Sequence, residues 1–257
     1  MADDKEQKHR EKVIEQFSQQ AVPFTQVPGH YDALQVLLEL SGVGTSDEVL
    51  DVACGPGLVA CAFARHAKHV TGVDITPAMI EQARQRQGEQ QLVNLSWDVG
   101  NAVPLAYPDS SFSLVLTRYS FHHLLDPQGA LSEMIRVCRP GGTVMVADVA
   151  IPSAKAAAYD HLELIRDPSH THALTEEEFE VLFQHSGLVD CRRSAYGVDI
   201  ELETQIKASF PKPGGDRVIR DMVTSDVGID SLGINARVKD GKIVYTVPIA
   251  VYAGKKR

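Results

Sequence analysis

Residues 49–74 read VLDVACGPGLVACAFARHAKHVTGVD, and they indicate the fold class of the chain. The apolar run Val49–Ala53 predicts a buried strand, which Gly55-Pro56-Gly57 ends. Apolar residues at helical spacing follow from Leu58, and a second apolar run ends on Asp74. Strand, glycine turn, helix, strand and terminal acid describe a nucleotide-binding βαβ unit. Its glycines let the backbone approach a ligand, and its acid suits ribose hydroxyls.

The details of the glycine turn separate the candidate ligands. A nicotinamide dinucleotide fingerprint, G-x-G-x-x-G, has its third glycine inside the helix. Here the helix continues as Leu58-Val59-Ala60, so that glycine is absent. Asp51, at the end of the first strand, would instead suit a cationic ligand such as the amine and sulfonium of a methionine derivative.

Composition excludes several classes of protein. The 257 residues are 44% apolar and 23% charged, which fits one large α/β domain. The net charge of −9 argues against an extended nucleic-acid surface. No apolar run approaches the ~20 residues that cross a bilayer. The first residues do not resemble a signal peptide and the four cysteines form no C-x-x-C pair, so we expect a cytoplasmic protein without a membrane span.

Two motifs carry a family resemblance. The pattern Asp51-x-Ala53-Cys54-Gly55-x-Gly57, with Asp74 on the second strand, resembles motif I of class I S-adenosylmethionine-dependent methyltransferases. The run PDSSFSLVLTRYSFHHLLDPQGALSEMIRVCRPGGTVMVADV, residues 108–149, resembles the P-D-x-S-F-D, H-H-x-x-D-P and R-V-L-R-P-G-G motifs of small-molecule methyltransferases. That family includes the ubiquinone/menaquinone-type C-methyltransferases. The resemblance covers residues 47–150.

The resemblance implies a Rossmann-like α/β fold. We expect a seven-stranded, mostly parallel sheet of order 3-2-1-4-5-7-6 with helices on both faces. Residues 1–257 would form a single methyltransferase domain with a helical cap (1–45), a cofactor-binding core (46–150), and substrate-side helices, a lid and a terminal β-hairpin (151–257). Patterning predicts helices at 5–20, 31–40, 58–64, 78–87, 128–138, 153–166, 176–185 and 216–227, and strands at 92–97, 112–116, 143–149, 188–195 and 242–254.

The resemblance also implies S-adenosyl-L-methionine as cofactor. The methionine end would lie near four residues of the glycine turn, Asp51, Ala53, Gly55 and Gly57. Asp74 would hold the ribose, and the adenine would lie along Ile75, Met79, Asn101 and Ala102. Asn101 stands where the family usually has an acid. Arg118 and Phe24 are further candidates, although Phe24 could equally pack on the core.

Catalytic candidates follow the fourth strand. Ligands of parallel α/β sheets bind outside the carboxyl ends of the strands, so the segment Arg118–His123 would border the cleft. His122 or His123 could act as a general base. Adjacent residues should not point the same way, so we expect at most one of them to face the substrate. Tyr119 and Asp148 are rim candidates. His170 and His172 are expected to be surface histidines, and no metal site is predicted.

The function expected from these features is in-line methyl transfer to a small molecule. Two alternatives remain open: a methyltransferase-fold protein that binds the cofactor or another ligand but catalyses a non-methylating reaction, and a non-catalytic partner subunit. A nicotinamide-dependent reductase is weaker, because its helix glycine is absent. The identity of the acceptor is not readable, and a homodimer is left open.

Overall fold

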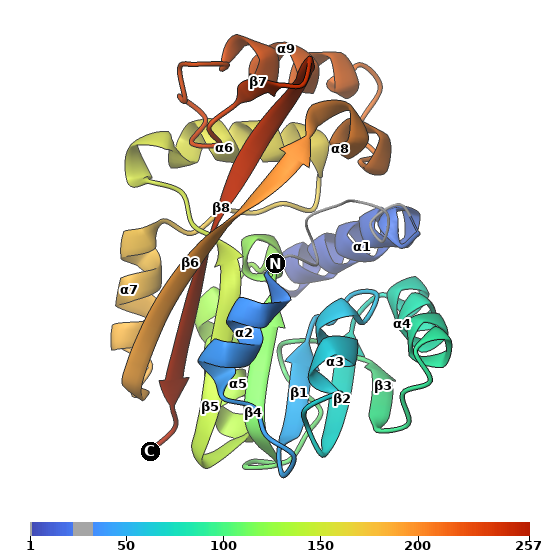
Figure 1. Cartoon of the computed structure of the whole chain (residues 1–257), viewed down its shortest axis with the longest axis vertical. Helices are drawn as coiled ribbons and strands as arrows, with labels where there is room; N and C mark the ends of the chain where they lie inside the picture. Colours follow the sequence, from blue (N-terminus) through green and yellow to red (C-terminus); the bar gives the residue numbers. More distant parts are fainter. Residues whose placement is uncertain (1, 23–32) are drawn as a thin grey trace.

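The computed structural model of the protein describes residues 2–22 and 33–257. Its centre is a sheet of order β3-β2-β1-β4-β5-β8-β6, to which β7 is added by pairing with β8 (Figure 1). β1 to β5 pair in parallel, whereas β8 is antiparallel to both β5 and β6. The expected order is therefore confirmed with β8 as its seventh strand, and the short β7 was not predicted. The strands are β1 Glu48–Val52, β2 His69–Asp74, β3 Leu95–Val99, β4 Phe112–Arg118, β5 Cys138–Val149, β6 Val189–Glu201, β7 Arg237–Lys239 and β8 Lys242–Lys255.

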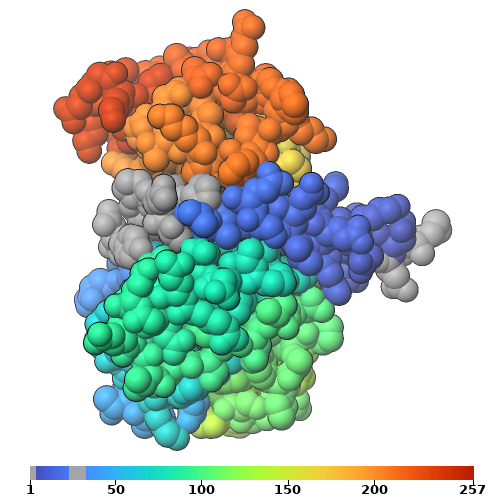
Figure 2. All heavy atoms as spheres, turned by 90° about the vertical axis from the view of Figure 1, so that its right-hand side faces the viewer, coloured from blue at the N-terminus to red at the C-terminus, as the bar shows by residue number. Residues whose placement is uncertain are grey.

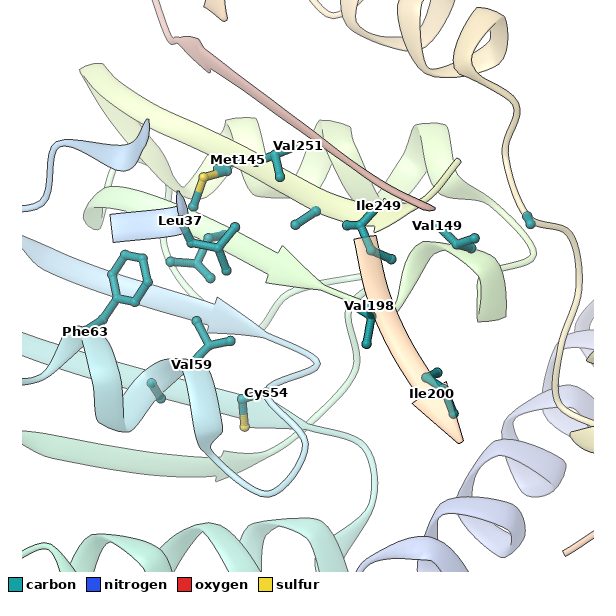
Figure 3. Packing of buried hydrophobic residues seen from close by; sticks show 14 of the residues in the cluster. Leu37, Cys54, Val59, Phe63, Met145, Val149, Val198, Ile200, Ile249 and Val251 are labelled. Atoms are coloured by element: carbon teal, nitrogen blue, oxygen red, sulfur yellow. The ribbon is translucent and has the colours of Figure 1, made fainter. Parts of the chain in front are cut away.

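Helices cover both faces of this sheet, because the central strands are apolar on both faces. In β4, Leu114 and Leu116 belong to one hydrophobic cluster and Val115 to the other, as the two-residue period of a strand requires. The first cluster includes Leu37 of α2 and Phe63 of α3, and Leu37 lies close to Met145 of the sheet (Figure 3). The second includes α5 and α7. The helices are α1 Ala2–Gln20, α2 Leu34–Ser41, α3 Leu58–Phe63, α4 Pro77–Glu89, η2 Phe121–His123 (a 3₁₀ turn), α5 Pro127–Val137, α6 Ser153–Arg166, α7 Glu176–Gln184, α8 Leu202–Ala208 and α9 Gly215–Ser225.

A second layer lies beyond the carboxyl ends of the parallel strands; it is called the cap from here on, and it is distinct from the cap predicted for residues 1–45. It consists of α6, α8, α9 and β7 together with the far ends of the long strands β6 and β8, around which they are grouped (Figure 1). Helix α1 lies between this cap and the core, as the blue band of Figure 2 shows. The edge where the parallel strands end at their carboxyl termini therefore faces the cap and α1.

Several predicted boundaries were wrong for local reasons. The third strand was expected at 92–97 but occupies Leu95–Val99, because α4 continues to Glu89 and a turn with positive φ at Gln91 follows. The turn expected at 139–142 is a bulge inside β5, whose pairing with β4 shifts between Phe112 and Leu114. β6 extends well past residue 195, and α8 was missed. The predicted start of the second helix, at Tyr31, lies outside the described residues.

No helix in the described ranges combines the length and the apolar character needed to span a membrane.

Candidate cofactor and acceptor site

A cavity of about 520 Å³ lies between the core and the cap. Its floor is the edge where β1, β2, β4 and β5 end, and its roof comes from α6, α8 and the far ends of β6 and β8. The amino-terminal helix α1 contributes one wall through residues such as His9, Val13 and Phe17. Twelve of the site residues predicted from the sequence lie in the described part of the chain. Eleven of these twelve line the cavity, and Gly57 does not. Phe24, also predicted, lies outside the described residues.

The turn after β1 has a left-handed backbone at Ala53, Gly55 and Gly57, with φ of 54°, 51° and 74°. A Cβ on Gly57 would lie 2.6 Å from the Trp97 ring and 2.9 Å from the Cβ of Ala83, so this glycine is required by internal packing. Around Gly55, by contrast, a Cβ would meet no atom of the described residues within 4 Å, and this residue lines the cavity. Only Gly55 therefore has the open approach that we expected of both glycines.

Asp74 organises the floor of the cavity. Its Oδ2 accepts a hydrogen bond from the Gly55 backbone N–H at 2.9 Å, and its Oδ1 accepts one from the Thr76 N–H at 2.8 Å. Burial raises the pKa of this carboxyl, and the two backbone bonds partly offset the rise. Thr76 is the N-cap of α4, but its side chain makes no capping bond. Asp74 thus ties the glycine turn to the next helix and retains acceptor capacity at the cavity.

Asp51 is a second carboxylate at this edge. It is 1% exposed, and its Oδ2 finds no hydrogen-bond partner in the described part of the chain. Burial raises its pKa to about 7, although the positive charge of nearby Arg118 opposes the rise. A buried carboxylate with an unpaired oxygen favours a ligand that brings a positive charge or a hydrogen-bond donor.

The remaining predicted cofactor residues also line the cavity. Ile75 and Met79 follow Asp74 along the chain, and Asn101 and Ala102 follow β3. The Arg118 guanidinium lies over the Tyr119 ring, 4.6 Å from its centroid. Ile75, Met79 and Ala102 are apolar, and Asn101 provides one amide. A flat heterocycle could pack on the apolar side chains and bond to the amide.

The histidine pair is arranged differently from the prediction. We expected the two rings to diverge, but His122 and His123 both line the cavity and their centroids are 4.2 Å apart. The 3₁₀ turn of η2 brings adjacent side chains together in this way. Their partners differ, however, and therefore so does their chemistry.

His122 forms a dyad with Asp148 at the end of β5. Its Nδ1 lies 2.5 Å from Asp148 Oδ1, and the other carboxylate oxygen accepts the Phe121 N–H at 2.6 Å. Burial alone would lower the pKa of His122, but the charge and hydrogen bond of Asp148 outweigh it and raise that pKa. With Nδ1–H directed to the carboxylate, Nε2 is the nitrogen that can accept a proton. Asp148, given little weight from the sequence, is thus part of the site.

His123 has a structural setting. Its Nδ1 lies 3.1 Å from Ser169 Oγ, which itself donates to Asp167 at 2.6 Å. Its carbonyl oxygen accepts a bond of 2.6 Å from His9 Nε2 on α1, and Gln20 at the end of α1 donates to Asp167 at 3.1 Å. Burial and then the charge of His122 lower the pKa of His123. This residue is therefore neutral, and its network holds α1 across the cavity. No sequence motif predicts these contacts.

The side of the cavity opposite the core is largely apolar. Val198 and Ile200 of β6 and Ile249 of β8 line it, close to Val149 at the end of β5 (Figure 3). Tyr159 of α6, a buried residue, lines it too. Opposite the carboxylates of the core, the cavity wall thus includes apolar and aromatic side chains.

His170 and His172 do not form a metal site with a third ligand. Both bond to Asp160, at 2.8 and 2.6 Å, and no group of three or more His, Cys, Asp or Glu residues in the described ranges could hold a metal ion. The expected surface position is wrong for His170, which is 3% exposed, because its ring packs against Tyr159 and the histidine pair.

Comparison with known proteins agrees with this geometry. Residues 50–146 match a family described as "Methyltransferase domain". An uncharacterized methyltransferase of Bacillus subtilis, YcgJ, is 28% identical over 176 residues, 68% of this chain and 70% of the relative. The demethylmenaquinone methyltransferase of Tropheryma whipplei is 35% identical over 126 residues, 49% of this chain and 52% of that enzyme. The chain therefore spans about half the length of this second relative.

The fold comparison covers more of the chain. The crystal structure of the Bacillus subtilis YcgJ protein superimposes with a TM-score of 0.80, over 89% of this chain and 99% of that one, at 24% identity. The shared fold therefore includes the cap as well as the core. With a methyltransferase domain over residues 50–146 and this architecture, the chain resembles the class I S-adenosylmethionine-dependent methyltransferases, including those of the ubiquinone/menaquinone-biosynthesis type.

Proposed function

We propose that this protein binds S-adenosyl-L-methionine and transfers its methyl group to a small molecule held under the cap. The observation that carries the proposal is a single cavity with two chemically different halves. Carboxylates at the ends of β1 and β2 form one half, and the other combines apolar and aromatic side chains with the Glu163–Arg166 ion pair of α6. A cationic nucleoside and an apolar acceptor would meet where these halves join.

The residues present fit the cofactor. Asp51 has an unpaired buried oxygen for the positively charged methionine end, and Gly55 leaves open space beside it. Asp74 would accept hydrogen bonds from the ribose, and Ile75, Met79 and the Asn101 amide would flank the adenine. The bound cofactor supplies an electrophilic methyl group, so the protein itself must position the acceptor and exclude water.

Within the protein, His122 would manage the acceptor's proton. The Asp148 carboxylate holds Nδ1–H, so that Nε2 is directed toward accepting a proton from a hydroxyl, an acidic C–H or an ammonium group. Asp148 also stabilises the imidazolium that results. His123 is not proposed as a base, because its contacts fix α1 and its pKa is lowered. Of the two histidines predicted, we therefore retain His122 for catalysis.

Turnover tests the proposal. The protein is incubated with S-adenosylmethionine that carries a labelled methyl group and with a panel of phenols, amines and quinols. The methylated product is extracted into an organic solvent, and the label in the extract is measured. We expect transfer to at least one acceptor and its loss in His122→Gln, with His185→Gln on the surface as matched control. Cofactor binding without transfer to any acceptor would favour the non-methylating alternative. A cytoplasmic location and a lack of nucleic-acid partners stay predictions, and a homodimer stays open.

A further inference from the structure

One face of α6 carries polar residues into the roof of the cavity. Tyr159, Glu163 and Arg166 are spaced four and three residues apart, which places them on the same side of a helix. All three line the cavity, and Tyr245 of β8 joins them there. These four residues, here called the α6 subsite, lie on the cap side, away from the Asp51 and Asp74 carboxylates of the core.

Glu163 and Arg166 form a buried ion pair within the α6 subsite. The Arg166 Nε lies 2.9 Å from both carboxylate oxygens of Glu163, and Nη2 donates to Oε2 at 2.5 Å. Their side chains are only 8% and 13% exposed. Burial would raise the pKa of Glu163, but the charge of Arg166 outweighs this and lowers it. The pair therefore stays ionised, and its charges cancel.

The two tyrosines are buried but unpaired. Tyr159 is 4% and Tyr245 is 5% exposed, and neither hydroxyl makes a hydrogen bond to any described residue. Both lie within the electrostatic reach of Glu163 and Arg166. Both tyrosines line the cavity, so their hydroxyls are open to it and available to a ligand group that bonds there. A tyrosine hydroxyl can both donate and accept, so it suits a hydroxyl or a carbonyl.

Apolar side chains line the cavity together with the α6 subsite, and Asp167 and His122 are charged or titratable groups close to it. Val198 and Ile200 of β6 and Val247 and Ile249 of β8 line the same cavity. A charged ligand group at the subsite would find no free countercharge in the ion pair. An anion would meet the Glu163 carboxylate, and a cation would meet the Arg166 guanidinium.

Resting on the proposed function, we propose that the α6 subsite selects an uncharged, mainly apolar acceptor that carries a hydroxyl or carbonyl group, which Tyr159 and Tyr245 anchor. The Glu163–Arg166 pair keeps the subsite polar but neutral, and so discriminates against carboxylates, phosphates and amines. These four are specificity-determining residues; the methyl-accepting atom lies toward His122.

Binding of matched probes tests this assignment. The protein is saturated with S-adenosylhomocysteine, and 4-butylphenol, 4-butylbenzoate and butylbenzene are titrated in turn. We expect the phenol to bind at least about tenfold more tightly than the other two. Tyr159→Phe and Tyr245→Phe should each weaken the binding of the phenol about threefold to tenfold, because one hydrogen bond between uncharged groups is removed. The binding of butylbenzene should be unchanged. Tyr252→Phe, a buried tyrosine that stacks on Phe179 away from the cavity, is the matched control.

A charge change provides an independent readout. Glu163→Gln leaves the Arg166 charge uncompensated, so this variant should bind 4-butylbenzoate more tightly than 4-butylphenol. If the wild-type protein prefers the benzoate, or if both tyrosine variants bind the phenol as the wild type does, the inference is wrong. Failure to bind S-adenosylhomocysteine would remove the proposed function and this inference together. Binding of S-adenosylhomocysteine without a preference for the phenol would remove the inference alone.

Discussion

The ionisation of Asp51 should make cofactor affinity depend on pH. In the free protein, burial raises the pKa of this carboxyl to about 7. A cationic ligand favours the carboxylate, so it lowers that pKa and displaces the proton when it binds. Affinity must then rise with pH until the free carboxyl is fully ionised. With a pKa of about 7, roughly 3% of the carboxyl is ionised at pH 5.5 and about 90% at pH 8.

The expected change is therefore about 30-fold in the dissociation constant between these two pH values, if binding requires the carboxylate. Isothermal titration of S-adenosylmethionine between pH 5.5 and 8 measures it. Asp51→Asn keeps the shape but not the charge, so its affinity should be lower at pH 8 and should change much less with pH than that of the wild type. Titration of the ligand or of Asp74 affects both proteins alike, so the difference isolates Asp51. Equal pH dependence in the two proteins would refute the reasoning.

Three further changes test other parts of the site. Asp74→Ala should cost about 2–3 kcal/mol of cofactor affinity by calorimetry, because acceptors for two hydroxyls are lost; unchanged affinity would remove Asp74 from the site. Asp148→Asn should lower the pKa of His122, so the ascending limb of kcat/KM should move to lower pH while its plateau falls about tenfold or more. An unshifted limb would show that His122 does not titrate in the reaction. Ala53→Gly should raise the free energy of unfolding by about 1 kcal/mol in urea, since φ is 54° at this alanine; a loss of stability would contradict the strain.

The core could be predicted from the sequence because its signals are local. The run from Val49 to Asp74 contains two strands, a glycine turn and a helix in unbroken order, and parallel pairing then places Asp51 beside Gly72, two residues before Asp74. Eleven predicted site residues consequently meet in one cavity.

The other features depend on residues far apart in the chain. The choice between His122 and His123 depends on Asp148, 26 residues beyond the first of them. Gly57 could not be recognised as a packing residue, because the ring that it contacts belongs to Trp97. A glutamate on a helix is usually exposed to solvent, so the sequence does not indicate that Glu163 is buried. Its burial depends on the ion pair with Arg166 inside the cavity. Short elements such as α8 and β7 have too few residues for a periodic pattern.

The most direct measurement is the equilibrium binding of S-adenosylmethionine to the purified protein, with NADH titrated in parallel. We predict saturable binding of S-adenosylmethionine at one site per chain, weakened in Asp74→Ala, and no saturable binding of NADH. An absence of heat with S-adenosylmethionine under conditions where the protein is folded, or binding of NADH in its place, would contradict the assignment of this cavity to a sulfonium nucleoside.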